Sequence, residues 1–135
     1  MTRRAFLLGR NTGSLRHCLA CDEETGALQA CDVQLMECCL LRHGFQVTLA
    51  EREANAGHIS NQLNAVIATC AQEDTFVFYF SGHSLTRQRD FFLVLANDKD
   101  NFSNLYLASQ LIAQLRSCKA GSKLLILDCC EAGQA

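Results

Sequence analysis

Two residues of this sequence could act together as a nucleophile and its base. His83 and Cys130 each follow a short apolar run, and positions 83 and 130 are 47 residues apart. A thiol with a pKa of about 8.5 is mostly protonated at neutral pH. A histidine beside it can stabilise the thiolate or accept its proton, and can later protonate a leaving amine. The pair predicts acyl-transfer chemistry. The simpler alternative is a buried structural thiol and a hydrogen-bonded histidine at the end of a strand.

The two apolar runs predict strands that would bring these residues together. Residues 75–80 and 123–127 are apolar on both alternating faces, which is typical of parallel strands covered by helices on both sides. His83 and Cys130 would then lie at the carboxyl ends of two strands. Open α/β sheets build their ligand sites at that edge.

The rest of the chain alternates between strand and helix patterns. Apolar spacing predicts strands over 5–9 and 45–49, helices over 28–43, 58–71 and 107–115, and a short strand or hairpin arm over 91–95. Gly44 is the expected stop of the first helix, and Ser103 or Asn104 is the expected cap of the third. Residues 10–27 are polar and predict a loop. The β-α-β-α-β-α-β order predicts an α/β fold with a mostly parallel sheet sandwiched between helices.

Composition limits the classes of function. The 135 residues predict one domain over 1–135, and the net charge of −2 with no basic stripe argues against nucleic-acid binding. Apolar runs of about five residues are far too short to span a membrane. Without a secretory signal, the nine cysteines are expected to be reduced thiols of a cytoplasmic protein.

Five segments of the chain resemble one known family. They are residues 5–9 (AFLLG), 30–36 (ACDVQLM), 44–47 (GFQV), 79–84 (YFSGHS) and 127–133 (LDCCEAG). The sequence resembles the large-subunit region of the caspase/metacaspase superfamily of cysteine peptidases, in its prokaryotic metacaspase-like branch. The last two segments carry most of the resemblance, and the family places its histidine about 50 residues before its cysteine. Three residues depart from the family pattern: Ser84 replaces a glycine, Glu131 a histidine and Cys31 an asparagine.

The resemblance implies roles for individual residues. It implies a caspase-like fold in which Cys130 is the nucleophile and His83 the acid and base, with the backbone N–H groups of Gly82 and Cys130 binding the oxyanion. It also implies that Asp32 and Asp128 line an acidic pocket, so that the enzyme cleaves polypeptides after Arg or Lys. The alternatives are a turn or capping role for Asp128 and an N-cap role for Asp32. Cys129 stands at a variable position of the motif and is expected to pack in the core.

Partners and cofactors follow from the same resemblance. The last predicted strand would leave an open sheet edge, which soluble proteins normally cover. We therefore expect an incomplete catalytic unit, completed by a small p10-like subunit, a C-terminal continuation or a second copy of the chain. No cofactor is expected. Some metacaspases bind calcium through aspartates, but Asp98 and Asp100 lack EF-hand spacing and predict a solvated loop.

Two other classes of function remain open from the sequence. The first is a caspase-like scaffold or regulatory module without activity. The second is a zinc- or redox-sensing protein, because His17, Cys18 and Cys21 include one Cys-x₂-Cys pair. No second such pair exists, so a zinc site would need distant ligands.

Overall fold

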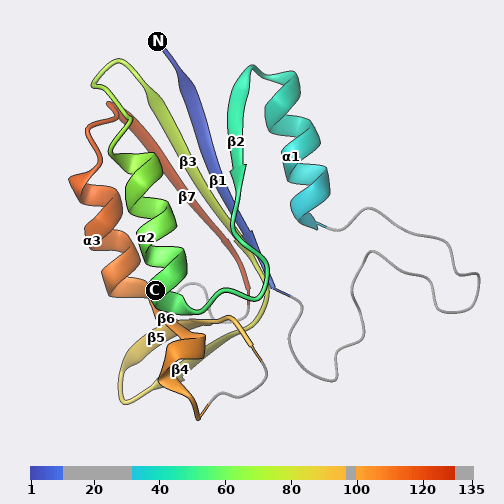
Figure 1. Ribbon diagram of the computed structural model, residues 1–135, viewed down its shortest axis with the longest axis vertical. Coiled ribbons are helices and arrows are strands. Elements are labelled where there is room, and N and C mark those ends of the chain that lie inside the picture. Colours follow the sequence, from blue (N-terminus) through green and yellow to red (C-terminus); the bar gives the residue numbers. More distant parts are fainter. Residues whose placement is uncertain (11–31, 97–99, 130–135) are drawn as a thin grey trace, which may run out of the picture.

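A four-stranded parallel sheet forms the centre of the molecule. The computed structural model describes residues 1–10, 32–96 and 100–129 (Figure 1). The strands pair in the order β2-β1-β3-β7. Their bounds are β1 (Arg3–Gly9), β2 (Phe45–Leu49), β3 (Thr75–Ser81) and β7 (Ser122–Asp128). All four predicted strands are confirmed, each within two residues of its expected limits.

Three helices cover the two faces of this sheet. Figure 1 shows α1 on one face, and α2 and α3 side by side on the other. Their bounds are α1 (Asp32–Arg42), α2 (Ala56–Ile67) and α3 (Ala108–Ser117). The predicted α/β architecture, with a mostly parallel sheet between helices, is confirmed.

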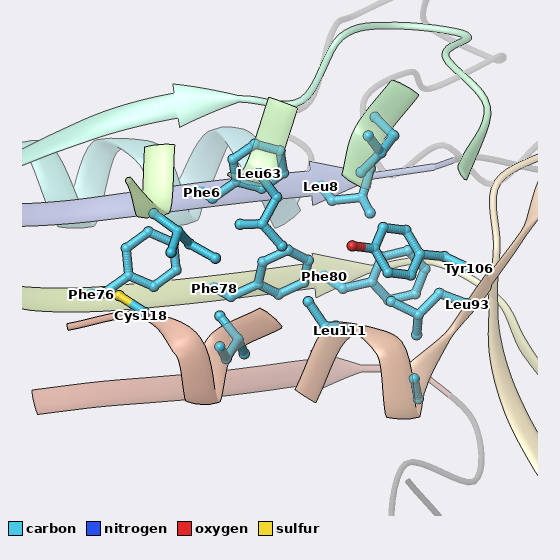
Figure 2. Packing of buried hydrophobic residues seen from close by; sticks show 14 of the residues in the cluster. Phe6, Leu8, Leu63, Phe76, Phe78, Phe80, Leu93, Tyr106, Leu111 and Cys118 are labelled. Carbon is cyan, nitrogen blue, oxygen red and sulfur yellow. The ribbon is translucent and has the colours of Figure 1, made fainter. Parts of the chain in front are cut away.

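The sheet separates two apolar clusters. On the face of α2 and α3, the phenylalanines of β3 pack with Phe6, Leu8, Leu63 and Leu111 (Figure 2), and the Phe6 and Phe78 rings stack with centroids 5.6 Å apart. On the face of α1, Val77 and Tyr79 join the smaller cluster around Leu40. β3 is therefore buried on both sides, which explains why its sequence shows no polar alternation.

A second, three-stranded antiparallel sheet lies beyond the carboxyl ends of the parallel strands (Figure 1). It consists of β4 (Ser84–Arg87), β5 (Asp90–Val94) and β6 (Leu105–Leu107). Only β5 was expected from the sequence, as the hairpin arm over 91–95. β4 escaped prediction because it is short and its turn residues, Gln88 and Arg89, carry positive φ angles of 51° and 70° without the glycine or asparagine that usually marks such a turn.

Several predicted helix boundaries were wrong, and local hydrogen bonds explain the differences. α2 ends at Ile67 rather than residue 71, because the N–H groups of Thr69 and Cys70 bond three residues back and tighten the last turn. Asn55 caps its start by accepting the His58 N–H. Gly44, with φ of 79°, ends α1 as expected. The predicted start over 28–31 lies outside the described residues.

The cap predicted for the third helix was also wrong. Ser103 and Asn104 belong to a short 3₁₀ helix (Phe102–Asn104) that Asn101 caps through its side chain. β6 intervenes before α3, whose first turn has no side-chain cap. The polar residues before α3 therefore form and cap the 3₁₀ helix, and they do not cap α3.

Through hydrogen bonds of its carboxylate, Asp74 links the segments that precede β1 and β3. It is only 5 % exposed, and its carboxylate accepts the N–H groups of Ala71 and Thr2 at 2.8 Å each. The Arg4 guanidinium lies 3.9 Å away. The two backbone hydrogen bonds and this positive charge hold the Asp74 pKa below its usual value.

This lowered pKa predicts an acid-sensitive contribution to stability. A depressed carboxylate pKa stabilises the fold above the unfolded value, about 4, and that stabilisation disappears as pH falls through the lower folded value. In Asp74→Asn, we expect a smaller free energy of unfolding at neutral pH and a shallower loss of stability below about pH 4. Urea unfolding at a series of pH values measures both quantities. Glu73→Gln, which removes the adjacent exposed carboxylate, is the control. Identical pH slopes for wild type and Asp74→Asn would contradict the prediction.

Candidate active site

His83 lies where the central sheet meets the antiparallel sheet. It follows β3 by two residues and directly precedes β4. Its carbonyl oxygen accepts the Val94 N–H at 2.9 Å, and its side chain is half-buried. The backbone of His83 is therefore held by β5, a strand that contributes to both the main core and the smaller cluster around Phe92.

Gly82, immediately before it, sits in a tightly packed position. A Cβ at this residue would lie 2.8 Å from the Arg10 carbonyl oxygen and 2.9 Å from the Phe80 ring. The Gly82 N–H donates to the Asp128 carbonyl at 3.3 Å, a long hydrogen bond that joins the ends of β3 and β7. Packing within the fold therefore already requires a glycine here, independently of any approach by substrate.

The two predicted pocket aspartates lie near the same tyrosine. Asp128 ends β7 and accepts the Tyr79 hydroxyl at 3.3 Å. Asp32 begins α1 and accepts the Ser81 hydroxyl at 3.2 Å. Tyr79 and Ser81 are alternate residues of β3, so both side chains point to the α1 face. The ends of a strand and of a helix therefore place Asp128 and Asp32 beside alternate residues of β3, although positions 32 and 128 are 96 residues apart in sequence.

Tyr79 lies within electrostatic range of both carboxylates. Burial, with smaller contributions from the charges of Asp128 and Asp32, raises the pKa of Tyr79 to about 12, although a hydrogen bond with Ser81 opposes the rise. The phenol therefore remains a hydrogen-bond donor at neutral pH. Asp32 also lies in the first turn of α1, where the helix dipole favours a negative charge.

Tyr79 and Ser81 are site residues that sequence reasoning missed. Both belong to the segment 79–84, in which the predicted roles concern only Gly82 and His83. The signal that could have found them is strand alternation: residues 79 and 81 share a face, and the parallel pairing places Asp128 directly opposite Ser81.

The predicted nucleophile, Cys130, lies outside the described residues. Its neighbour Cys129 packs against the larger apolar cluster, which confirms its expected packing role. Asp98, Cys31 and the group of His17, Cys18 and Cys21 also lie outside the described residues.

Within the described ranges, no group of three or more His, Cys, Asp or Glu side chains is arranged to hold a metal ion. In those ranges, too, no helix has the length and apolarity needed to cross a membrane.

Comparison with known proteins agrees with this architecture. The family model of the caspase domain matches residues 3–135. The chain belongs to the caspase-domain family. This is a family of peptidases, and the expected caspase-like fold is confirmed.

One solved structure shows the same fold at low sequence identity. The crystal structure of protein GSU0716 from Geobacter sulfurreducens is similar to this chain with a TM-score of 0.67 and 22 % identity. The match covers 96 % of this caspase-domain chain and 51 % of the other, so the chain spans about half the length of that protein. No curated protein matches the sequence.

The close packing at Gly82 yields a testable expectation. In Gly82→Ala, the added methyl would press on the Arg10 carbonyl and the buried Phe80 ring, so we expect a loss of about 1–3 kcal/mol in the free energy of unfolding. Urea unfolding measures this loss. Gly57→Ala is the matched control, because its Cβ would meet only Asn55 Oδ1 at 3.6 Å. That variant should be as stable as wild type or up to about 1 kcal/mol more stable. Equal behaviour of the two variants would refute the packing argument.

Proposed function

We propose that this caspase-domain chain carries the dyad of a metacaspase-like cysteine endopeptidase that cleaves after Arg or Lys. The Cys130 thiolate attacks the peptide carbonyl carbon, a C–S bond forms, and the peptide C–N bond breaks. His83 gives its proton to the leaving amine. Water then attacks the thioester while His83 takes its proton, which releases the new carboxylate and restores the thiol.

Strand register supports the pairing of His83 with Cys130. Ser81 and Asp128 are partners in the parallel ladder of β3 and β7. His83 follows the first by two residues and Cys130 follows the second by two. A long hydrogen bond of 3.3 Å from the Gly82 N–H to the Asp128 carbonyl joins these two extensions. Equal steps from paired residues on adjacent strands favour a short distance between imidazole and thiol.

Oxyanion stabilisation is assigned to two backbone N–H groups, those of Cys130 and Gly82. The Gly82 N–H engages the Asp128 carbonyl through a bond of 3.3 Å. A bond of this length is weak. Substrate binding would therefore redirect this donor at small cost.

The pair of carboxylates carries the specificity proposal. Asp32 and Asp128 come from two different elements, and each accepts a hydroxyl from β3, Asp128 from Tyr79 and Asp32 from Ser81. Two negative charges close together favour a cationic guest and disfavour an aspartate side chain. A guanidinium or ammonium at this position satisfies both carboxylates.

A peptide panel tests the activity and the specificity together. The full-length protein is incubated with peptides that differ only before the scissile bond, as Arg, Lys, Asp or Ala. We expect cleavage after Arg and Lys, none after Asp, and complete loss in Cys130→Ala. Cleavage after Asp would retain the dyad and overturn the acidic pocket. No cleavage by folded protein, with and without calcium, would reject the peptidase.

The second candidate function is a scaffold without activity. One departure from the family pattern favours it: Ser84, rather than glycine, follows the histidine and begins β4. A scaffold needs no activated thiol, whereas a peptidase does.

Thiol reactivity separates the peptidase from the scaffold. Cys130 should alkylate fastest, while Cys38 and Cys39, exposed on α1, report the rate that access alone allows. Cys70 should be slowest, because burial and the adjacent Cys118 thiol raise its pKa to about 11. The advantage of Cys130 should disappear in His83→Ala. Mass spectrometry of each cysteine measures the rates, and Cys130 reacting no faster than Cys38 would favour the scaffold.

The free edge of β7 supports a further structural proposal. Among the described strands β7 ends the sheet, and Leu124 on it is 53 % exposed. We propose that a p10-like subunit, a C-terminal continuation or a second copy covers this edge and completes the pocket. The 51 % coverage of the similar solved structure favours further polypeptide over a second copy.

A further inference from the structure

Tyr79 is a core residue whose hydroxyl lies at the edge of the apolar cluster. Its side chain is only 4 % exposed and its ring packs in the cluster with Ala5, Leu7 and Leu40 beneath α1. Its hydroxyl nevertheless reaches the carboxyl end of β7, where it meets Asp128. The ring is thus fixed by packing while its oxygen lies at the proposed pocket.

Each hydroxyl of this cluster has a carboxylate acceptor within reach. Tyr79 and Ser81 each carry one hydroxyl proton, and the structure offers one carboxylate to each: Asp128 to the tyrosine and Asp32 to the serine. Charged acceptors make stronger hydrogen bonds than neutral ones, so both protons go to carboxylates. Asp128 therefore has a rigid, buried donor 3.3 Å from its Oδ2, whereas its side chain otherwise lies on an exposed strand end.

We propose that Tyr79 is a positioning residue that orients the Asp128 carboxylate and thereby sets a preference for Arg over Lys before the scissile bond. The proposal rests on the proposed function, because it concerns the pocket assigned there. Tyr79 touches the carboxylate rather than the reacting atoms. Its effect is therefore expected in substrate recognition and not in the chemical step.

Geometry explains why the two basic residues should respond differently. A guanidinium is a planar fork whose paired N–H groups need a carboxylate held in one plane. An ammonium is a compact charge with rotatable donors, and it tolerates a carboxylate that turns. Removing the Tyr79 hydroxyl frees Asp128 to rotate, so binding of Arg should weaken more than binding of Lys.

The substitution Tyr79→Phe tests this with little change of volume. In the full-length protein we expect kcat/KM for the Arg peptide to fall about tenfold, mainly through KM, with a much smaller fall for the Lys peptide. Tyr106→Phe is the matched control. That tyrosine is also buried, but its hydroxyl bonds to Gln114 among the helices of the opposite face. It should leave the ratio of Arg to Lys cleavage unchanged, even if the fold is less stable.

A binding measurement keeps the inference separate from turnover. Peptides ending in Arg or Lys are titrated against the Cys130→Ala protein with and without Tyr79→Phe, by fluorescence anisotropy. Tighter binding of the Arg peptide that is lost with Tyr79→Phe supports the inference. An unchanged Arg-to-Lys ratio, or an equal loss for both peptides, overturns the inference and leaves the proposed function standing. Binding of neither peptide rejects the acidic pocket and the inference with it.

Discussion

The parallel pairing of β3 with β7 is the constraint on which the rest of this structure depends. Seven consecutive residue pairs, from Thr75 opposite Ser122 to Ser81 opposite Asp128, fix the two strands to one another. A slip of one residue would turn every side chain of a strand to the opposite face. Phe76, Phe78 and Phe80 would then leave the large apolar cluster, so burial of three aromatic rings enforces the register. The same register sets which polar groups meet at the carboxyl ends.

The two carboxylates of the candidate site lie at the ends of secondary-structure elements. Asp128 is the last residue of a strand and Asp32 the first of a helix. The chain leaves the apolar layers at both of these ends, so each carboxylate can be partly solvated while it accepts a hydroxyl from β3. Tyr79 joins the two environments, because its ring belongs to the core and its oxygen to the polar cluster. Burying a phenol is tolerable only when its hydroxyl has a partner, and Asp128 supplies one.

The small antiparallel sheet holds the backbone of His83 in place through the Val94 N–H of β5. Phe91 and Leu93 of β5 point into the large cluster, while Phe92 and Val94 form a cluster on the other side with Leu105. The hairpin turn at Gln88 and Arg89 places two side-chain-bearing residues in the left-handed region, which costs about 1–2 kcal/mol per residue. Burial on both faces of β5 offsets this strain. The histidine is therefore positioned by two sheets at once.

The sequence by itself determined the alternation of strands and helices, the buried nature of the strand 75–80, and the placement of His83 and Asp128 at strand ends. The expectation that 123–127 is also buried was wrong, because β7 lies at the edge of the described sheet and Leu124 on it is 53 % exposed. Hydrophobic periodicity is a local property of the chain, so it can be recognised from the sequence alone. Tertiary structure alone decided that the hydroxyls of Tyr79 and Ser81 bond to Asp128 and Asp32, that Gly82 is required by Arg10 and Phe80, and that β4 and β6 form. These outcomes depend on contacts between segments up to 72 residues apart, from Arg10 to Gly82, and the spacing of residues along the chain does not encode such distances.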